Sequence, residues 1–434
     1  MGNEPMAEPT TSLRTEVVAG LTTFFTMAYI VIVNPAVLGG DATGMPASGV
    51  LSATVLTCIV STLLMGLYAR LPYALAPGMG LNAFVAFTVI AGKGIAWPVA
   101  LGLVFWSGVL FLLISVTPVR ERIAHAIPAS LRAGAAAGIG LFLAFIGLKN
   151  AGVVVDHPAT LVTLGPIGVE TGAFTLGLVL AAYLLHRKQP LAFLAGIAAA
   201  TAVGLASGKV KPPARLVSAP DLSSVMFELD VVAALDVSLL PVLAALFFTD
   251  LFDSLSTFVG VAEAADLKDD DGEPKNLRKA LIVDAIATLS AGLFGSSPGT
   301  TYIESAAGIE MGGRRGATAV VCALCFVPCL FLGPVVAMVP AYATGAVLVL
   351  VGALMFRSVV DRKLGSVEEL LPVFLTAILI PLTFSITQGL LWGFISHVVL
   401  YVLTGRMREL SATMVALALI AAGLLALHLS LIHI

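Results

Sequence analysis

Apolar stretches long enough to cross a lipid bilayer recur along the whole chain. Examples are residues 50–67, 99–116, 133–148 and 191–206. A hydrocarbon layer roughly 30 Å thick is crossed by about 20 apolar residues in a helix. Of the 434 residues, 59% are hydrophobic and only 11% are charged, unlike soluble domains. We therefore expect an all-α polytopic membrane protein with about 14 transmembrane spans in the lipid bilayer.

Lysine and arginine are unevenly distributed among the loops between these spans. If residues 1–13 are cytoplasmic and the loops alternate, most of the 23 lysines and arginines face the cytoplasm. The exceptions are Lys93, Lys149, Lys209, Lys211 and Arg215. Because cytoplasmic loops carry an excess of these residues, both termini are predicted to be cytoplasmic in a plasma (inner) membrane. A net charge of −3 does not indicate nucleic acid as a partner.

Two halves of the chain resemble each other. Phe24-Phe25-Thr26 recurs as Phe247-Phe248-Thr249, and each precedes a Pro-Gly break by a similar distance. Seven spans per half is an odd number, so the halves form an inverted repeat. The predicted segments are a cytoplasmic N-terminal segment (1–13), a first repeat (14–207, spans 1–7), an extracellular linker (208–237), a second repeat (238–405, spans 8–14) and a C-terminal segment with a possible extra helix (406–434). Residues 222–235 of the linker are expected to form a short amphipathic surface helix.

Proline and glycine interrupt the third and tenth spans at matching positions. The breaks contain Pro77, Gly78 and Gly80 in the first half, and Pro298 and Gly299 in the second. Such residues stop a helix, and free backbone groups at membrane depth are tolerated only beside protein or a watery cavity. Both spans are therefore predicted to be broken half-helices with short extended stretches, as at the binding sites of secondary transporters. The alternative is a packing kink.

Four carboxyl groups lie within apolar spans that contain no lysine or arginine. They are Asp250, Asp253, Asp284 and Glu304. Carboxyl groups inside a membrane are costly and are functional candidates by default. Because loss of water favours the protonated form, all four are candidate proton-coupling residues. Alternatively, Asp284 makes a structural hydrogen bond, and Asp250 caps or braces a neighbouring segment.

These residues lie in motifs that resemble the AzgA-like purine permeases of the nucleobase–cation symporter-2 (nucleobase–ascorbate transporter) family. The most specific stretches are residues 76–84 (APGMGLNAF), 250–253 (DLFD) and 301–308 (TYIESAAG), and the similarity covers nearly the whole chain. The resemblance implies a 7+7 inverted repeat with a core domain (spans 1–4 and 8–11) and a gate domain (spans 5–7 and 12–14). It also implies proton symport of adenine, guanine or hypoxanthine by alternating access, and a homodimer formed through the gate domains.

The resemblance places the base-binding site at Asn82, at an aspartate of the pair Asp250 and Asp253, and at Glu304. A carboxylate and an amide suit a neutral purine, which offers both N–H groups and acceptor atoms. The wider predicted substrate-binding set consists of neighbours of these motifs, namely Ala83, Phe84, Phe25, Tyr302 and Ser305. Phe25, Tyr29 and Phe84 either cover a face of the base or simply pack. Ser256 and the turn at residues 297–299 depart from the family pattern, which leaves the choice of purine open.

Three other functions are weighed against this interpretation. An anion transporter of the sulfate or bicarbonate type could share the scaffold but would not favour an acid such as Glu304 at the site. A uracil- or xanthine-selective symporter remains an alternative within the family. An intramembrane aspartyl protease needs a Gly-x-Gly-Asp motif in a span, and the nearest match, Gly39-Gly40-Asp41, lies in a loop. We therefore expect no enzyme, no cofactor and no metal.

Overall fold

The computed structural model describes residues 11–117, 128–265 and 275–432. Eight helical segments in this part are long and apolar enough to cross a membrane: Leu13–Leu38, Ala47–Ala69, Trp97–Val116, Ala129–Asn150, Val169–His186, Val237–Leu255, Ala341–Val360 and Ile386–Leu403. Shorter apolar helices cover Met79–Gly92, Ala192–Ala206, Gly316–Phe331 and Ala412–Gly423. The chain is therefore a multi-pass α-helical membrane protein, while the exact number of crossings stays a prediction.

The first half begins with a helix that is interrupted by a turn, and this turn contributes to the site described below. Ser12 caps α1 by accepting a hydrogen bond from the Thr15 amide, and a turn at residues 28–29 separates α1 from α2. The elements are α1 (Leu13–Met27), α2 (Ile30–Leu38), α3 (Ala47–Leu64), η1 (Met65–Ala69), β1 (Leu75–Pro77), α4 (Met79–Ala83), η2 (Phe84–Gly92), α5 (Trp97–Val116), α7 (Ala129–Asn150), β2 (Val154–His157), β3 (Leu161–Leu164), α8 (Val169–His186) and α9 (Ala192–Ala206).

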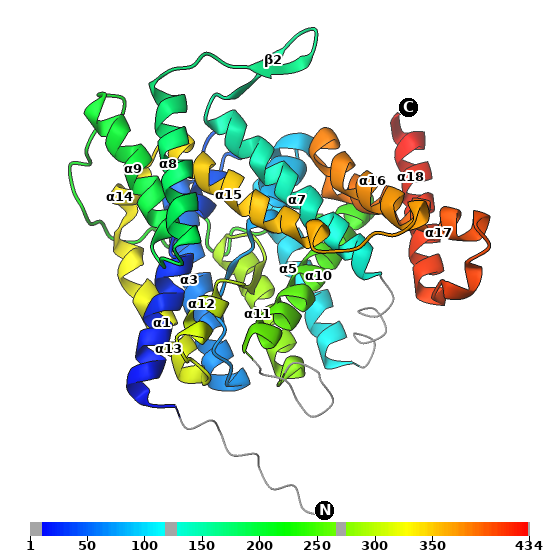
Figure 1. Cartoon of the computed structure of the whole chain (residues 1–434), viewed down its shortest axis with the longest axis horizontal. Coiled ribbons are helices and arrows are strands. Elements are labelled where there is room, and N and C mark those ends of the chain that lie inside the picture. The colour runs from blue at the N-terminus through cyan, green and yellow to red at the C-terminus, as the bar shows by residue number, and fades with distance from the viewer. Residues whose placement is uncertain (1–10, 118–127, 266–274, 433–434) are drawn as a thin grey trace, which may run out of the picture.

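The second half follows the same order of long helices around a short strand. Its elements are η3 (Ala233–Leu235), η4 (Val237–Leu239), α10 (Leu240–Ala265), α11 (Leu277–Phe294), β4 (Gly299–Thr301), α12 (Ser305–Glu310), α13 (Gly316–Phe326), η5 (Val327–Phe331), α14 (Gly333–Ala337), α15 (Ala341–Val360), α16 (Val367–Thr383), α17 (Ile386–Leu403), η6 (Met407–Glu409) and α18 (Ala412–Ile432). The halves interlock: α1 packs beside α13, α5 beside α11, and α7 beside α15 (Figure 1).

The two predicted breaks meet in space and pair with each other. Strands β1 and β4 are antiparallel, with Leu75 opposite Thr301 and Pro77 opposite Gly299. The Gly78 amide adds a hydrogen bond to the Pro298 carbonyl at 2.9 Å. Both strands are buried, so the backbone groups that each break frees are satisfied by the other break. This confirms that spans 3 and 10 are broken and include short extended stretches.

Glycines allow α7 and α15 to cross at backbone contact. A Cβ atom built on Gly352 would lie 2.3 Å from the Gly140 carbonyl oxygen, and one on Gly147 would lie 2.5 Å from the Gly345 carbonyl oxygen. Small residues permit such close approach where lipid provides no hydrophobic driving force between helices. The crossing therefore joins matching helices of the two halves.

The linker between the halves runs as irregular chain against the ends of several helices. Its amides at Ser218, Phe227 and Asp230 donate to the carbonyls of Phe331, Leu293 and Pro98, respectively. Within residues 222–235 the only regular element is the three-residue turn η3. The predicted amphipathic helix is therefore wrong: the segment makes only isolated turns with its own backbone, and the amides of Phe227 and Asp230 are taken by carbonyls of other segments.

Candidate functional site

A cavity of about 100 Å³ lies where the two broken spans meet the second-half helices. Both breaks contribute to its wall, through Gly78 and Gly80 on one side and Tyr302 and Glu304 on the other. The turn between α1 and α2, helix α10 and helix α15 supply the rest. The cavity therefore combines residues from both halves of the repeat.

Glu304 is the N-cap residue of α12 and faces this cavity. The Tyr29 hydroxyl donates a hydrogen bond of 2.6 Å to Glu304 Oε1. Tyr29 is only 1% exposed, and its ring packs against that of Phe193 at 4.6 Å between centroids. Because the ring is fixed by packing, the hydroxyl orients the carboxylate, and a carboxylate can accept further hydrogen bonds.

Asp253 is the second acid in the cavity wall, and it comes from α10. The other two acids lie behind the wall and are fully buried. Asp284 accepts hydrogen bonds from the Thr301 amide at 2.9 Å, from the Thr301 hydroxyl at 3.0 Å and from the Ser254 hydroxyl. It therefore fixes the position of β4, which agrees with the structural alternative for this residue.

Asp250 is held less completely than Asp284. The Thr288 hydroxyl lies 2.6 Å from Asp250 Oδ2 and 3.1 Å from the Gly299 carbonyl oxygen. The other carboxylate oxygen of Asp250 has no hydrogen-bond partner in the described part of the chain. No ion pair with lysine or arginine neutralises any of the four acids among the described residues.

Several residues of the predicted binding set do not reach the cavity wall. Asn82, Ala83, Phe84 and Ser305 are fully buried behind it. The Ser305 hydroxyl instead accepts a hydrogen bond from the Ala74 amide at 3.0 Å. Phe25 is 38% exposed and contacts Phe24, so the structure does not place it against a bound base. Its orientation on α1 could not be read from the sequence, because the turn that follows α1 carries Tyr29 inward instead.

The turn residues of the breaks have two different positions. Gly78 and Gly80 line the cavity, whereas Pro77 and Gly299 are paired with each other in the two strands. The Tyr302 hydroxyl donates to the Pro77 carbonyl oxygen, which ties the second break to the first. The Pro-Gly motifs therefore build the paired strands, while Gly78 of the first motif and residues next to the motifs form part of the cavity wall.

A larger cavity of about 530 Å³ adjoins Glu304 from another side. It lies between α1 and α12, the turn that joins α8 to α9, and α15. At its edge Lys188 and Glu310 form an exposed ion pair of 3.4 Å. Its volume is within the range of pockets that hold small ligands, and Glu304 is one of its lining residues.

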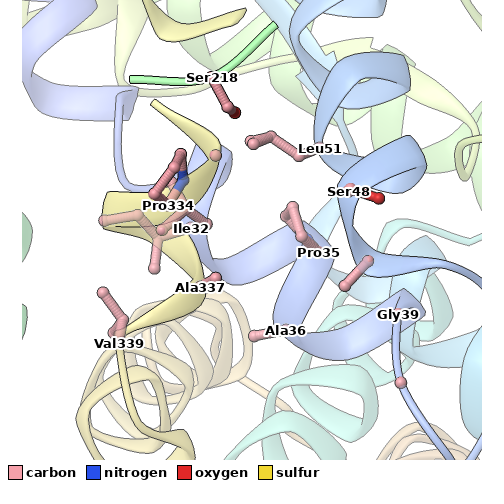
Figure 2. Close-up of a pocket in the computed structure, with 14 residues that line it drawn as sticks. Ile32, Pro35, Ala36, Gly39, Ser48, Leu51, Ser218, Pro334, Ala337 and Val339 are labelled. Atoms are coloured by element: carbon pink, nitrogen blue, oxygen red, sulfur yellow. The ribbon is translucent and has the colours of Figure 1, made fainter. Parts of the chain in front are cut away.

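A third cavity, of about 430 Å³, has no ionisable side chain in its lining (Figure 2). Residues of α2, α3 and α14 line it, and Ser48 and Ser218 supply its only side-chain hydroxyls. None of the four acids contributes to it. The binding site is assigned instead to the smaller cavity, whose wall carries the carboxyl groups of Asp253 and Glu304.

The described residues contain no group of three or more His, Cys, Asp or Glu side chains arranged to hold a metal ion. All four cysteines are free. Three of them follow one another on α13 and η5, and two of these are buried.

Comparison with known proteins gives the family of the chain. The profile described as "Permease family" (Xan_ur_permease) matches residues 14–392. The chain is 41% identical to the adenine permease AdeP of Escherichia coli, over 96% of this chain and 93% of that protein. It is 39% identical to the guanine/hypoxanthine permease PbuO of Bacillus subtilis, over 96% of this chain and 98% of that protein.

Solved structures share the fold at much lower sequence identity. The transmembrane domain of the cyanobacterial bicarbonate transporter BicA superposes with a TM-score of 0.67 at 16% identity, covering 88% of this chain and 98% of that one. A murine anion transporter of the Solute Carrier 26 family, in its inward-facing state, gives a TM-score of 0.63 at 10% identity over 92% of this chain and 70% of that one. With the paired breaks, the placement of Glu304 and the relatives' similarity taken together, this chain belongs to the permease family and has a membrane-transporter fold.

Proposed function

We propose that this protein transports purine nucleobases, namely adenine, guanine or hypoxanthine, into the cell by proton symport. The relatives that carry this proposal are named adenine permease and guanine/hypoxanthine permease, at 41% and 39% identity over nearly the whole chain. The resemblance found in motifs 76–84, 250–253 and 301–308 supports the same class of solute.

The observation that carries the proposal is the carboxylate of Glu304 in the wall between the paired breaks. One of its oxygens accepts from Tyr29, and the carboxylate has room for further donors. A purine presents ring and exocyclic N–H groups to such an acceptor. Asp253 adds a second carboxyl group in the same wall.

We assign the coupled proton to the carboxyl groups Asp250, Asp253, Asp284 and Glu304, of which Asp250 and Asp284 are fully buried and the other two partly buried. A buried charge without an ion-pair partner is costly, so protonation of one of these groups and binding of a neutral base favour each other. Asp250 is the residue with an unpaired oxygen behind the cavity, and Asp253 is the one in its wall. Either one can carry the proton.

Alternating access is proposed as a movement of the core domain (spans 1–4 and 8–11) against the gate domain (spans 5–7 and 12–14). The packing supports this division, since α7 contacts α15 and α16 while α5 contacts α11. The larger cavity lies between α1 and α12 of the core and α8, α9 and α15 of the gate. We further propose a homodimer through the gate domains and cytoplasmic termini in the plasma (inner) membrane.

An anion transporter is a weaker candidate despite the fold shared with bicarbonate and anion transporters. Among the described residues, the charged groups in the wall of the smaller cavity are Asp253 and Glu304, and both are acids. Such a wall repels an anion. No covalent chemistry is proposed for the protein.

A competition assay tests the solute assignment. Cells that lack their own base transporters express the protein and take up labelled hypoxanthine against unlabelled adenine, guanine, xanthine, uracil, sulfate or bicarbonate. Uptake of labelled hypoxanthine that adenine or guanine reduces supports the proposal. Competition by uracil or xanthine alone would assign a different nucleobase, and no uptake, or an effect of sulfate or bicarbonate alone, would refute the proposal.

A further inference from the structure

Asn34 is a buried residue of α2 that the sequence did not single out. It lies behind the paired breaks and is 0% exposed. Its amide nitrogen donates to the Thr54 hydroxyl at 2.7 Å and to the Ser296 hydroxyl at 3.0 Å. Its carbonyl oxygen accepts from the Asn82 amide nitrogen at 3.0 Å. This one side chain therefore links α3 to the segments around both breaks.

The direction of these hydrogen bonds is set at Thr54. The Thr54 hydroxyl donates its single hydrogen to the Val50 carbonyl at 2.6 Å. It can therefore only accept from Asn34, which forces the Asn34 amide to turn its nitrogen toward Thr54. The Asn34 carbonyl is then directed at Asn82, and Asn82 must present its nitrogen in return.

The carbonyl oxygen of Asn82 is left over by this arrangement. It is buried and has no hydrogen-bond partner in the described part of the chain. A buried acceptor without a donor is uncommon and costly, so it calls for a group that pairs with it in some state of the protein. Asn82 lies in α4 just after Gly78 and Gly80, which form the cavity wall.

We propose that Asn34 is a positioning residue that fixes the Asn82 amide with its carbonyl oxygen free to accept an N–H group of the transported base. In the base-bound state the N–H group meets this oxygen directly or through one water molecule. The proposal rests on the proposed transport of nucleobases and deepens it. In this arrangement the Asn82 atom that contacts the base is an acceptor and not a donor. The site therefore discriminates between bases by the pattern of donors along one edge of the base.

The test compares three variants of the hydrogen-bonded chain that runs from Thr54 through Asn34 to Asn82. Asn34→Ala removes the amide, and Thr54→Val removes the acceptor that fixes it while keeping the size of the side chain. Thr54→Ser keeps the hydroxyl and is the matched control. Adenine and hypoxanthine present opposite patterns at one edge, an amine beside a ring acceptor in the first and a carbonyl beside a ring N–H in the second.

The readout is the ratio of the KM values for adenine and hypoxanthine, with the protein level in the membrane measured for each variant. Asn34→Ala and Thr54→Val should each shift this ratio toward one by about 3- to 10-fold. The reason is that the Asn82 amide, no longer fixed, can rotate so that its nitrogen and oxygen exchange positions. Thr54→Ser should keep the wild-type ratio. A purely structural role would lower uptake of both bases equally and leave the ratio unchanged.

An unchanged ratio in Thr54→Val, at a wild-type level of folded protein, overturns the proposal even if Asn34→Ala does not fold. An equal shift in Thr54→Ser and Thr54→Val also overturns it. If the wild-type protein takes up neither base, the proposed function itself fails, and the assignment of Asn82 fails with it. The wild-type measurement therefore distinguishes the two failures.

Discussion

The substitution Gly352→Ala tests the glycine crossing of α7 and α15. A Cβ atom at this position would lie 2.3 Å from the Gly140 carbonyl oxygen, whereas ordinary contacts begin at 3.4 Å, so the helices must separate by about 1 Å. Overpacking of this kind costs about 1–3 kcal/mol. Alanine recovers at most about 1 kcal/mol, because it is a better helix former than glycine. We therefore expect a net loss of stability.

The matched control is Gly172→Ala in α8. No atom lies within 4 Å of a Cβ atom built there, so alanine should be neutral or slightly stabilising. Thermal unfolding followed by size-exclusion chromatography in detergent should show a Tm lower by about 2–5 °C for Gly352→Ala only. Equal Tm values for Gly352→Ala and Gly172→Ala would refute the proposed backbone contact between the two helices.

Two further substitutions test the site and the linker. Tyr29→Phe removes the hydroxyl that orients Glu304 and should raise the KM for the base by about 10-fold or more at unchanged protein level, measured from the concentration dependence of uptake; an unchanged KM would contradict this role. Hydrogen bonds from Ser224 and Ser48 hold the pKa of Asp221 below its ordinary value. Such a group stabilises the fold above its unfolded pKa of about 3.9, and this contribution is lost as the pH falls through the lower folded pKa. Asp221→Asn should therefore lower the Tm at pH 7, and this effect should shrink as the pH falls through the lowered folded pKa; an effect that does not depend on pH would argue against these hydrogen bonds.

The sequence was most informative where backbone chemistry limits the possible structures. Proline and glycine at membrane depth leave few arrangements, and the breaks at Pro77 and Pro298 indeed form short extended segments that pair. The acids in apolar spans were equally visible, and two of them, Asp253 and Glu304, share a cavity. Both features follow from local rules, because a bilayer tolerates neither unpaired backbone groups nor uncompensated charges.

Contacts between distant segments could not be read in the same way. Tyr29 was a candidate for covering a base face, but its hydroxyl instead binds a carboxylate 275 positions further along the chain. Asn82 belongs to a family motif, and the sequence does not show that its amide nitrogen binds Asn34. Asn34 itself stands in an apolar helix, and only its contacts with segments far away in sequence show its importance. Periodicity and spacing do not encode such side-chain pairings.

Proton-driven uptake of labelled hypoxanthine into proteoliposomes tests the central claim most directly, with wild-type protein and Glu304→Gln compared at equal protein level. The carboxamide of the variant keeps the size of the side chain but removes its charge and one acceptor oxygen. We expect an inward proton gradient to drive accumulation by the wild type, a protonophore to abolish it, and Glu304→Gln to reduce it at least about 10-fold. Accumulation by Glu304→Gln at the wild-type rate, or wild-type uptake that ignores both pH and protonophore, would contradict the account.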